Sequence, residues 1–158
     1  MIRFKKIKAL KDGKLRIEYE QKNKDSWDEY TLNCSDEPKD SYGAALQALA
    51  GDVIEMCELP EDYLPRITVT GVSFSYGGDE EVMGAVITAS MRLNKSNQPL
   101  NLNTPHKTET WYSETGSELS LLHPDCVERL QVLTDEAQDY IGGVRKQVDL
   151  FVEMEVVK

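Results

Sequence analysis

Apolar and polar residues alternate along the first 34 residues in three successive segments, Phe4–Leu10, Leu15–Tyr19 and Trp27–Cys34. In the second segment apolar and charged residues alternate strictly, which is the period of a strand with one buried and one solvated face. Asp12-Gly13 stands between the first two segments and is typical of a tight turn between antiparallel strands. The pattern therefore predicts three strands, of which the first two form a hairpin.

Two later stretches carry the period of a helix. Over Tyr42–Met56 apolar residues recur every three or four positions, with Gly51 as a weak point, and this predicts one helix that ends before Pro60. Similar spacing over Pro124–Ile141 predicts a second helix, and Gly142-Gly143 supplies its C-terminal stop.

The middle of the chain is rich in β-branched and aromatic residues. Ile67–Tyr76 and Val82–Leu93 are predicted strands joined across a Gly-Gly-Asp turn, and Leu100–Thr104 is a shorter one. Residues 106–120 are polar and without clear periodicity, which is typical of a functional or mobile loop. Hairpins of strands interrupted by helices predict an α+β fold, an antiparallel sheet with two helices packed on it.

Length and composition favour one folded unit. We expect a single α+β domain over residues 1–146, followed by a tail over residues 147–158. The hydrophobic content of 40% and charged content of 29% are typical of soluble proteins, and no apolar run has the length of a membrane span. The chain starts without the apolar region of a signal peptide, so we expect a cytoplasmic protein with reduced cysteines and no membrane partner.

Charge is distributed unevenly along the sequence. Residues 1–24 hold nine Lys or Arg against three acids, a net charge of +6. Since the whole chain has a net charge of −10, the remaining 134 residues carry −16. A pI of about 4.7 argues against general nucleic-acid binding. It is compatible with a local basic hairpin, or with an acidic surface that binds a basic protein.

A nucleic-acid contact through the first hairpin is one candidate. Its residues would be Arg3, Lys5, Lys6, Lys8, Trp111 and Tyr112, the two aromatics stacking on unpaired bases. Strict alternation predicts that Lys6 and Lys8 leave one face of the strand and Arg3 and Lys5 the other, which would divide the charge. Lysines that deter edge-to-edge pairing, and aromatics buried as loop anchors, are the structural alternatives.

The sequence offers no catalytic constellation. His123 and Cys126 are one helical turn apart, but no Cys-x-x-Cys pair accompanies them, so we expect no metal site. Gly77-Gly78 is not followed by the lysine and helix of a phosphate loop. We therefore expect a non-enzymatic protein without a cofactor.

The most specific signal lies near the C-terminus. Gln147-Val148-Asp149-Leu150-Phe151 resembles the pentapeptide by which bacterial replication and repair proteins dock on the DNA sliding clamp, with Val148 where Leu is usual. In such a peptide Leu150 and Phe151 fill a preformed apolar pocket, and Gln147 fixes the register. Alternatively, Val148 and Phe151 extend the apolar stripe of the second helix, although Gly142-Gly143 would interrupt that helix.

The chain as a whole resembles small uncharacterised proteins encoded by bacteriophages and prophages. The stretches that carry this resemblance are Ile67–Ser73, Leu100–Pro105 and the ending Gln147–Phe151. It implies a setting in which host replication proteins are recruited or blocked. The first hypothesis is therefore an accessory protein that docks on the host sliding clamp. An acidic inhibitor of a basic nucleic-acid-binding host protein, such as a defence nuclease, and a direct nucleic-acid binder are the alternatives.

Overall fold

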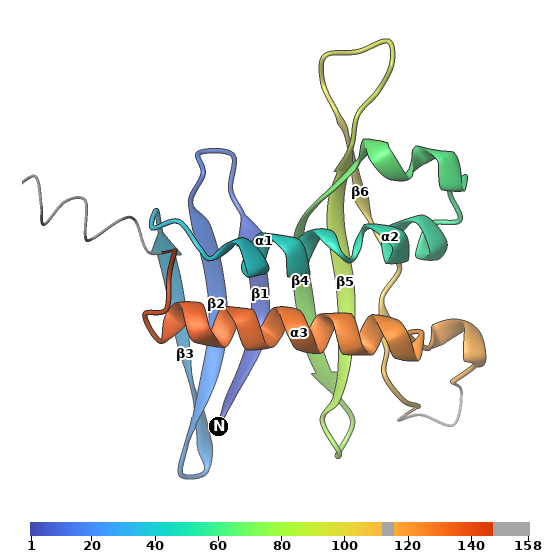
Figure 1. The fold of residues 1–158 in the computed structure, drawn as a ribbon. Coiled ribbons are helices and arrows are strands. Elements are labelled where there is room, and N and C mark those ends of the chain that lie inside the picture. Colours follow the sequence, from blue (N-terminus) through green and yellow to red (C-terminus); the bar gives the residue numbers. More distant parts are fainter. Residues whose placement is uncertain (112–115, 147–158) are drawn as a thin grey trace, which may run out of the picture.

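The computed structural model describes residues 1–111 and 116–146, and its strands join in one antiparallel sheet (Figure 1). The strand order is β3-β2-β1-β4-β5-β6, and β7 also pairs with β5. The strands are β1 (Ile2–Ala9), β2 (Leu15–Asn23), β3 (Ser26–Cys34), β4 (Ile67–Gly77), β5 (Val82–Met91), β6 (Leu100–Asn103) and β7 (Lys107–Thr108).

Three α-helices lie on one face of this sheet (Figure 1). They are α1 (Asp40–Gln47), α2 (Ala50–Met56) and α3 (Pro124–Ile141), and two short 3₁₀ helices, η1 (Glu61–Arg66) and η2 (Glu118–Ser120), complete the described elements. The α+β class with an antiparallel, hairpin-built sheet is confirmed. None of the helices in the described ranges combines the length and the apolar composition needed to cross a membrane.

The core lies between the sheet and the helices. Side chains from alternate strand positions, such as Ile17 and Ile87, share this core with Val53 and Leu133 from the helices and with Leu49 just before α2. Each of these five side chains is fully buried. Burial of a large aliphatic side chain contributes about 1.5–3 kcal/mol. The alternation of apolar and polar residues in the strands thus predicts which face of the sheet the helices pack against.

The predicted first helix is in fact two helices, with a break at Ala48–Leu49 rather than at Gly51. At the end of α1 the Gln47 side chain pairs with the backbone of β4, donating to Ile67 O at 2.9 Å and accepting from Val69 N at 3.1 Å. The Gln47 amide thus pairs with backbone groups of β4 that lie beyond the contact with β1. Without it these groups would lack a partner, and a buried backbone group without a partner costs free energy.

Strand β1 pairs with β4 over only three residues, Lys6–Lys8 against Gly71–Ser73. The two backbones approach closely there, since a Cβ added at Gly71 would lie 2.6 Å from Ile7 O. Beyond this contact the start of β1 and the end of β4 diverge, and side chains fill the space between them.

Candidate interaction surfaces

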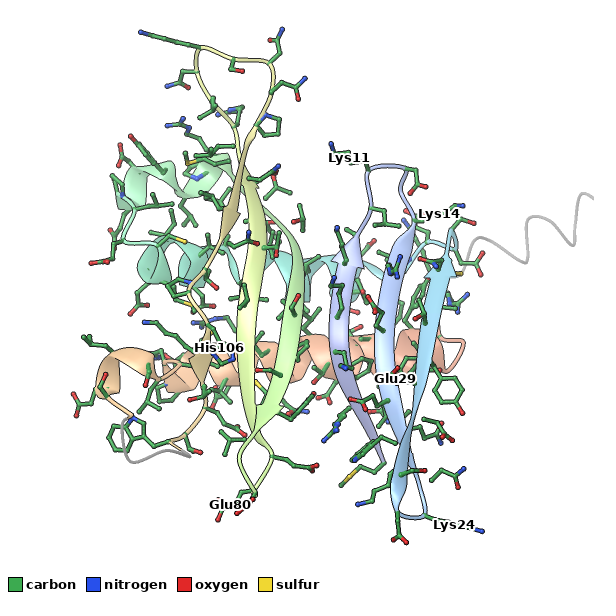
Figure 2. The ribbon with its side chains drawn as sticks, turned by 180° about the vertical axis from the view of Figure 1, so that it is seen from behind. Lys11, Lys14, Lys24, Glu29, Glu80 and His106 are labelled. Carbon is green, nitrogen blue, oxygen red and sulfur yellow. The ribbon has the colours of Figure 1, made fainter. Side chains whose placement is uncertain are left out.

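The sheet face opposite the helices is not covered by any described element (Figure 2). On this face the β1–β3 half carries mainly charged side chains. The β4–β6 half carries mainly hydroxyls and amides. Such a polar face needs no covering layer, because its side chains are solvated.

A β-bulge decides which side chains of β1 reach this open face. The register with β2 shifts between Phe4 and Lys6, so Arg3, Lys6 and Lys8 all stand opposite residues of one face of β2. The predicted division of the basic residues between two faces is therefore wrong. The inserted residue restores Phe4 and Ile7 to the core while leaving the charges together, which strict alternation cannot do.

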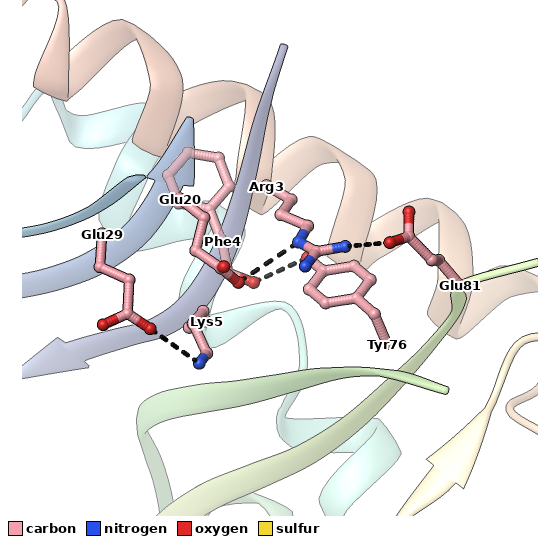
Figure 3. A network of polar contacts seen from close by, with 7 residues as sticks. All are labelled: Arg3, Phe4, Lys5, Glu20, Glu29, Tyr76 and Glu81. Atoms are coloured by element: carbon pink, nitrogen blue, oxygen red, sulfur yellow. Dashed lines mark hydrogen bonds and ion pairs between the residues drawn. The ribbon is translucent and has the colours of Figure 1, made fainter. Parts of the chain in front are cut away.

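Arg3 is nevertheless a structural residue. Its guanidinium group lies 3.3 Å from Glu20, 3.0 Å from Glu81 and 4.8 Å from the centre of the Tyr76 ring (Figure 3). The same group stacks 4.0 Å above the Trp27 ring. Burial opposes its charge, yet the contacts with the two glutamates raise the Arg3 pKa. With its side chain only 19% exposed, Arg3 closes the gap between β1 and β4 and presents little charge to solvent.

Tyr76 completes the same network. Its hydroxyl donates to Phe4 O at 2.7 Å, and burial raises the Tyr76 pKa to about 12 (Figure 3). Lys5 lies 3.6 Å from Glu29 across the open face, and both side chains are substantially exposed (Figure 3). Arg3 and Lys5 are thus paired with acids, although the sequence placed them among the nucleic-acid candidates.

The other cations of the hairpin are differently placed. Lys8 stands directly opposite Arg16 in the sheet, an unfavourable pair of like charges on an exposed face. Lys11 and Lys14 follow at the hairpin tip, where both are exposed (Figure 2). Within residues 1–111 and 116–146 no ion pair engages Lys6, Lys8, Lys11 or Lys14. Arg16 contacts Glu18 at 3.4 Å.

His106 lies on the open face next to Ser75, with its Nε2 2.7 Å from the Ser75 hydroxyl (Figure 2). Gly84 makes room for the imidazole, because a Cβ there would lie 2.4 Å from Nε2. The contact pins the connection between β6 and β7 to the sheet. Sequence reasoning missed it, since the three residues come from separate segments.

Trp111 does not join the basic hairpin. Trp111 follows β7, which pairs with β5, and β4 separates β5 from β1. Its side chain is 51% exposed, so the alternative that it is a buried anchor is wrong, although its Nε1 donates to Ser117 O at 2.9 Å. Tyr112 lies outside the described residues.

Acidic residues gather in the helical layer. Residues 36–66 and 124–146 together contain thirteen acids and five bases, whereas residues 1–34 contain nine bases and six acids. One of these acids, Asp52, is buried and accepts two hydrogen bonds from Arg129 at 2.7 and 2.8 Å. Most of the others are exposed, so the molecule has an acidic helical side and a more basic open sheet face.

The C-terminal helix ends where the glycines predicted. Helix α3 stops at Ile141, Gly143 has a φ of +99°, and Val144 is 47% exposed. The next two residues are anchored to the loop before α1: Arg145 forms an ion pair with Asp36, and Lys146 N donates to Glu37 O at 3.0 Å. The candidate docking peptide Gln147–Phe151 lies outside the described residues.

The structure also contains a shallow groove of about 270 Å³ between α3 and the diverging ends of β1 and β4. Arg3, Phe4, Tyr76 and Leu130 are among its lining residues. Among the described residues, no group of three or more His, Cys, Asp or Glu side chains has a metal-binding arrangement. Burial raises the pKa of Cys126 to about 12, which disfavours the thiolate that metal ligation requires.

Comparison with protein-family models, curated proteins and solved structures gives no match to this chain.

Proposed function

We propose that this protein is a non-enzymatic accessory protein of phage type that docks on the host DNA sliding clamp through Gln147–Phe151. The end of α3 at Ile141 carries the proposal. A continuous helical stripe through Val144 to Phe151 was the competing interpretation, and it requires a helix where Gly143 adopts a left-handed backbone. The candidate peptide begins directly after Arg145 and Lys146, which are anchored to the loop before α1.

The test is binding of the purified full chain to purified clamp. Leu150 and Phe151 together would desolvate enough surface for about 3–6 kcal/mol, so Leu150→Ala with Phe151→Ala should weaken binding at least 100-fold. The matched control is Leu119→Ala with Val132→Ala, since both residues are apolar and exposed outside the tail. Val148→Leu should tighten binding. Equal affinity of these three variants and the unmodified chain would refute the proposal.

The distribution of acids supports a second candidate, an inhibitor of a basic nucleic-acid-binding host protein in the cytoplasm. An evenly spread acidic surface would have argued against it, and the exposed acids instead concentrate in the helical layer. Such a layer would compete with nucleic acid for a basic channel, with strong salt dependence.

Competition with DNA for a purified basic nuclease tests this candidate. Removal of residues 147–158 should leave the inhibition unchanged, whereas Asp135→Asn with Asp139→Asn should weaken it, because both carboxylates are exposed on α3. Inhibition that depends on the tail and not on α3 would contradict it.

A further inference from the structure

The open sheet face has a partly unbalanced positive charge at one end. Lys11 and Lys14 lie at the opposite end of the sheet from Lys24 and Glu80 (Figure 2). Lys8 and Arg16 continue the charge from the hairpin tip onto the strands. The hairpin itself contributes two acids near these cations, Asp12 in the tip and Glu18, which contacts Arg16. Asp36 and Glu37 follow β3 at the same end of the sheet, where they are paired with Arg145 and Lys146.

The loop between β5 and β6 lies at the same end of the sheet (Figure 1). The strand register requires this, since Ile67 pairs with Met91 and Lys8 with Gly71, so β5 ends where β1 ends. Residues 92–99 of the loop include Arg92 and Lys95 and no acid. Two basic loops therefore flank one end of the open face.

Next to the β5–β6 loop the open face is made of small polar groups. Thr88, Ser90, Asn101 and Asn103 stand side by side on β5 and β6, and the Thr88 hydroxyl donates to Asn103 Oδ1 at 3.0 Å. Hydroxyl and amide side chains are common ligands of phosphate and sugar oxygens. Surfaces that bind proteins instead have an apolar, aromatic centre.

Neither described tryptophan lies at the basic end of the open face. Trp27 pairs with Lys22 at the other end of the sheet, where the Arg3 guanidinium covers its ring at 4.0 Å and Lys22 Nζ lies 5.6 Å away. Trp111 is half exposed, but it follows β7, which pairs with the start of β5 at that same other end. Single-strand binders rely on exposed aromatic platforms. The combination of exposed cations and hydroxyls at one end, with both described tryptophans at the other, therefore favours contact with a sugar–phosphate backbone over contact with unpaired bases.

We propose that the basic end of the open sheet face, Lys8, Lys11, Lys14 and Arg16 with the β5–β6 loop, binds the phosphate backbone of duplex DNA without reading its sequence. The cross-strand pair of Lys8 and Arg16 supports DNA binding, because the two like charges repel each other in the free protein and a bound polyanion would relieve that repulsion. The acidic helical layer lies on the other side of the sheet, so it orients the protein with its basic face toward DNA. This proposal does not depend on the docking peptide.

Binding of the full chain to a short labelled duplex tests the proposal by fluorescence anisotropy. Four phosphate contacts give a slope of about −3.6 for log K against log salt, which corresponds to about a 100-fold loss of affinity between 50 and 200 mM salt. The expected affinity is that of non-specific binding, with a Kd of about 10⁻⁴–10⁻⁶ M.

Two matched double variants separate a local site from net charge. Lys8→Gln with Arg16→Gln should reduce the magnitude of the salt slope by about 2, since each lost phosphate contact reduces it by about 1. Lys24→Asn with Lys39→Gln removes the same charge from the far end of the sheet and from the helical side, and should leave the slope unchanged. Asn is chosen at position 24 because Lys24 has a φ of +58°.

Three outcomes would overturn the proposal. Equal loss in both double variants would mean that only net charge matters. Tighter binding of single-stranded than duplex DNA by tenfold or more would point to base stacking. Binding of a poly-glutamate peptide as tightly as the duplex would assign the face to an acidic protein instead. None of these outcomes involves Leu150 or Phe151, so clamp docking is tested separately.

Discussion

Replacement of Arg3 by Met should destabilise the protein without affecting its ligand binding. The methionine keeps the apolar stem but removes the guanidinium group that contacts Glu20 at 3.3 Å and stacks on Trp27 at 4.0 Å. The carboxylate of Glu20, with its side chain 10% exposed, then lacks its cation. The Glu81 side chain is 54% exposed and becomes hydrated when the guanidinium is removed, so loss of the Arg3–Glu81 ion pair costs little stability.

The magnitude follows from these contacts. A hydrogen bond to a charged group contributes about 1.5–3 kcal/mol, and each cation–π contact at a partly exposed position adds about 0.5–1 kcal/mol. Since Glu20 can recover some hydration by moving, we expect a net loss of about 3 kcal/mol. For a domain of this size that corresponds to a decrease in Tm of about 6–12 °C.

Urea unfolding followed by tryptophan fluorescence is the direct assay, because Trp27 lies beneath the guanidinium. Adding Glu20→Gln to Arg3→Met should recover about 1–2 kcal/mol, since the second change removes the unpaired buried charge. A loss under about 0.5 kcal/mol for Arg3→Met, or no recovery in the double variant, would refute the structural role of Arg3. At temperatures where Arg3→Met is folded, its affinity for duplex DNA should equal that of the unmodified chain.

Three further predictions concern other parts of the fold, and a fourth concerns Tyr76 of the same network. Arg129→Ala should cost about 2–4 kcal/mol in chemical unfolding because it leaves Asp52 buried without its partner, while Arg129→Met with Asp52→Leu should be nearly neutral; equal losses would contradict this. Gly71→Ala should lower Tm by several degrees because its Cβ would meet backbone at 2.6 Å. Gly51→Ala, in open space within α2, should raise stability by about 0.5–1 kcal/mol. Stability should fall as pH rises from about 10 to 12, since unfolded tyrosine deprotonates before Tyr76 does in the native state, and Tyr76→Phe should reduce this slope in pH-dependent unfolding.

Sequence reasoning succeeded where a local pattern has one physical interpretation. Alternation over Leu15–Tyr19 can bury a face only in a strand, and Asp12-Gly13 joins two strands in a tight turn, so the first hairpin followed directly. Gly142-Gly143 likewise ended α3, because glycine loses more backbone freedom in a helix than other residues and favours the left-handed conformation at Gly143. The break between α1 and α2 was not predicted, because neither residue at the break, Ala48 or Leu49, is a glycine or a proline.

The candidate surfaces were harder to predict because they combine distant segments. A bulge between Phe4 and Lys6 reversed the expected directions of Arg3 and Lys5, and no residue type in β1 marks it. Pairing with Glu20 and Glu81 then made Arg3 structural. The hydroxyls and amides of β5 and β6 read in sequence as ordinary solvated strand residues.

The sequence by itself determined the fold class, the helix stop before Arg145 and the docking-like peptide that follows, because each depends on neighbours along the chain. Only the tertiary structure decided which charges act together. Whether a cation is paired or available depends on strand register and on which acids the topology brings within about 4 Å, and Coulomb energies at that range change steeply with distance and burial. Lys8 and Arg16 were set face to face, and Arg3 was enclosed, by pairings that the order of residues alone does not specify.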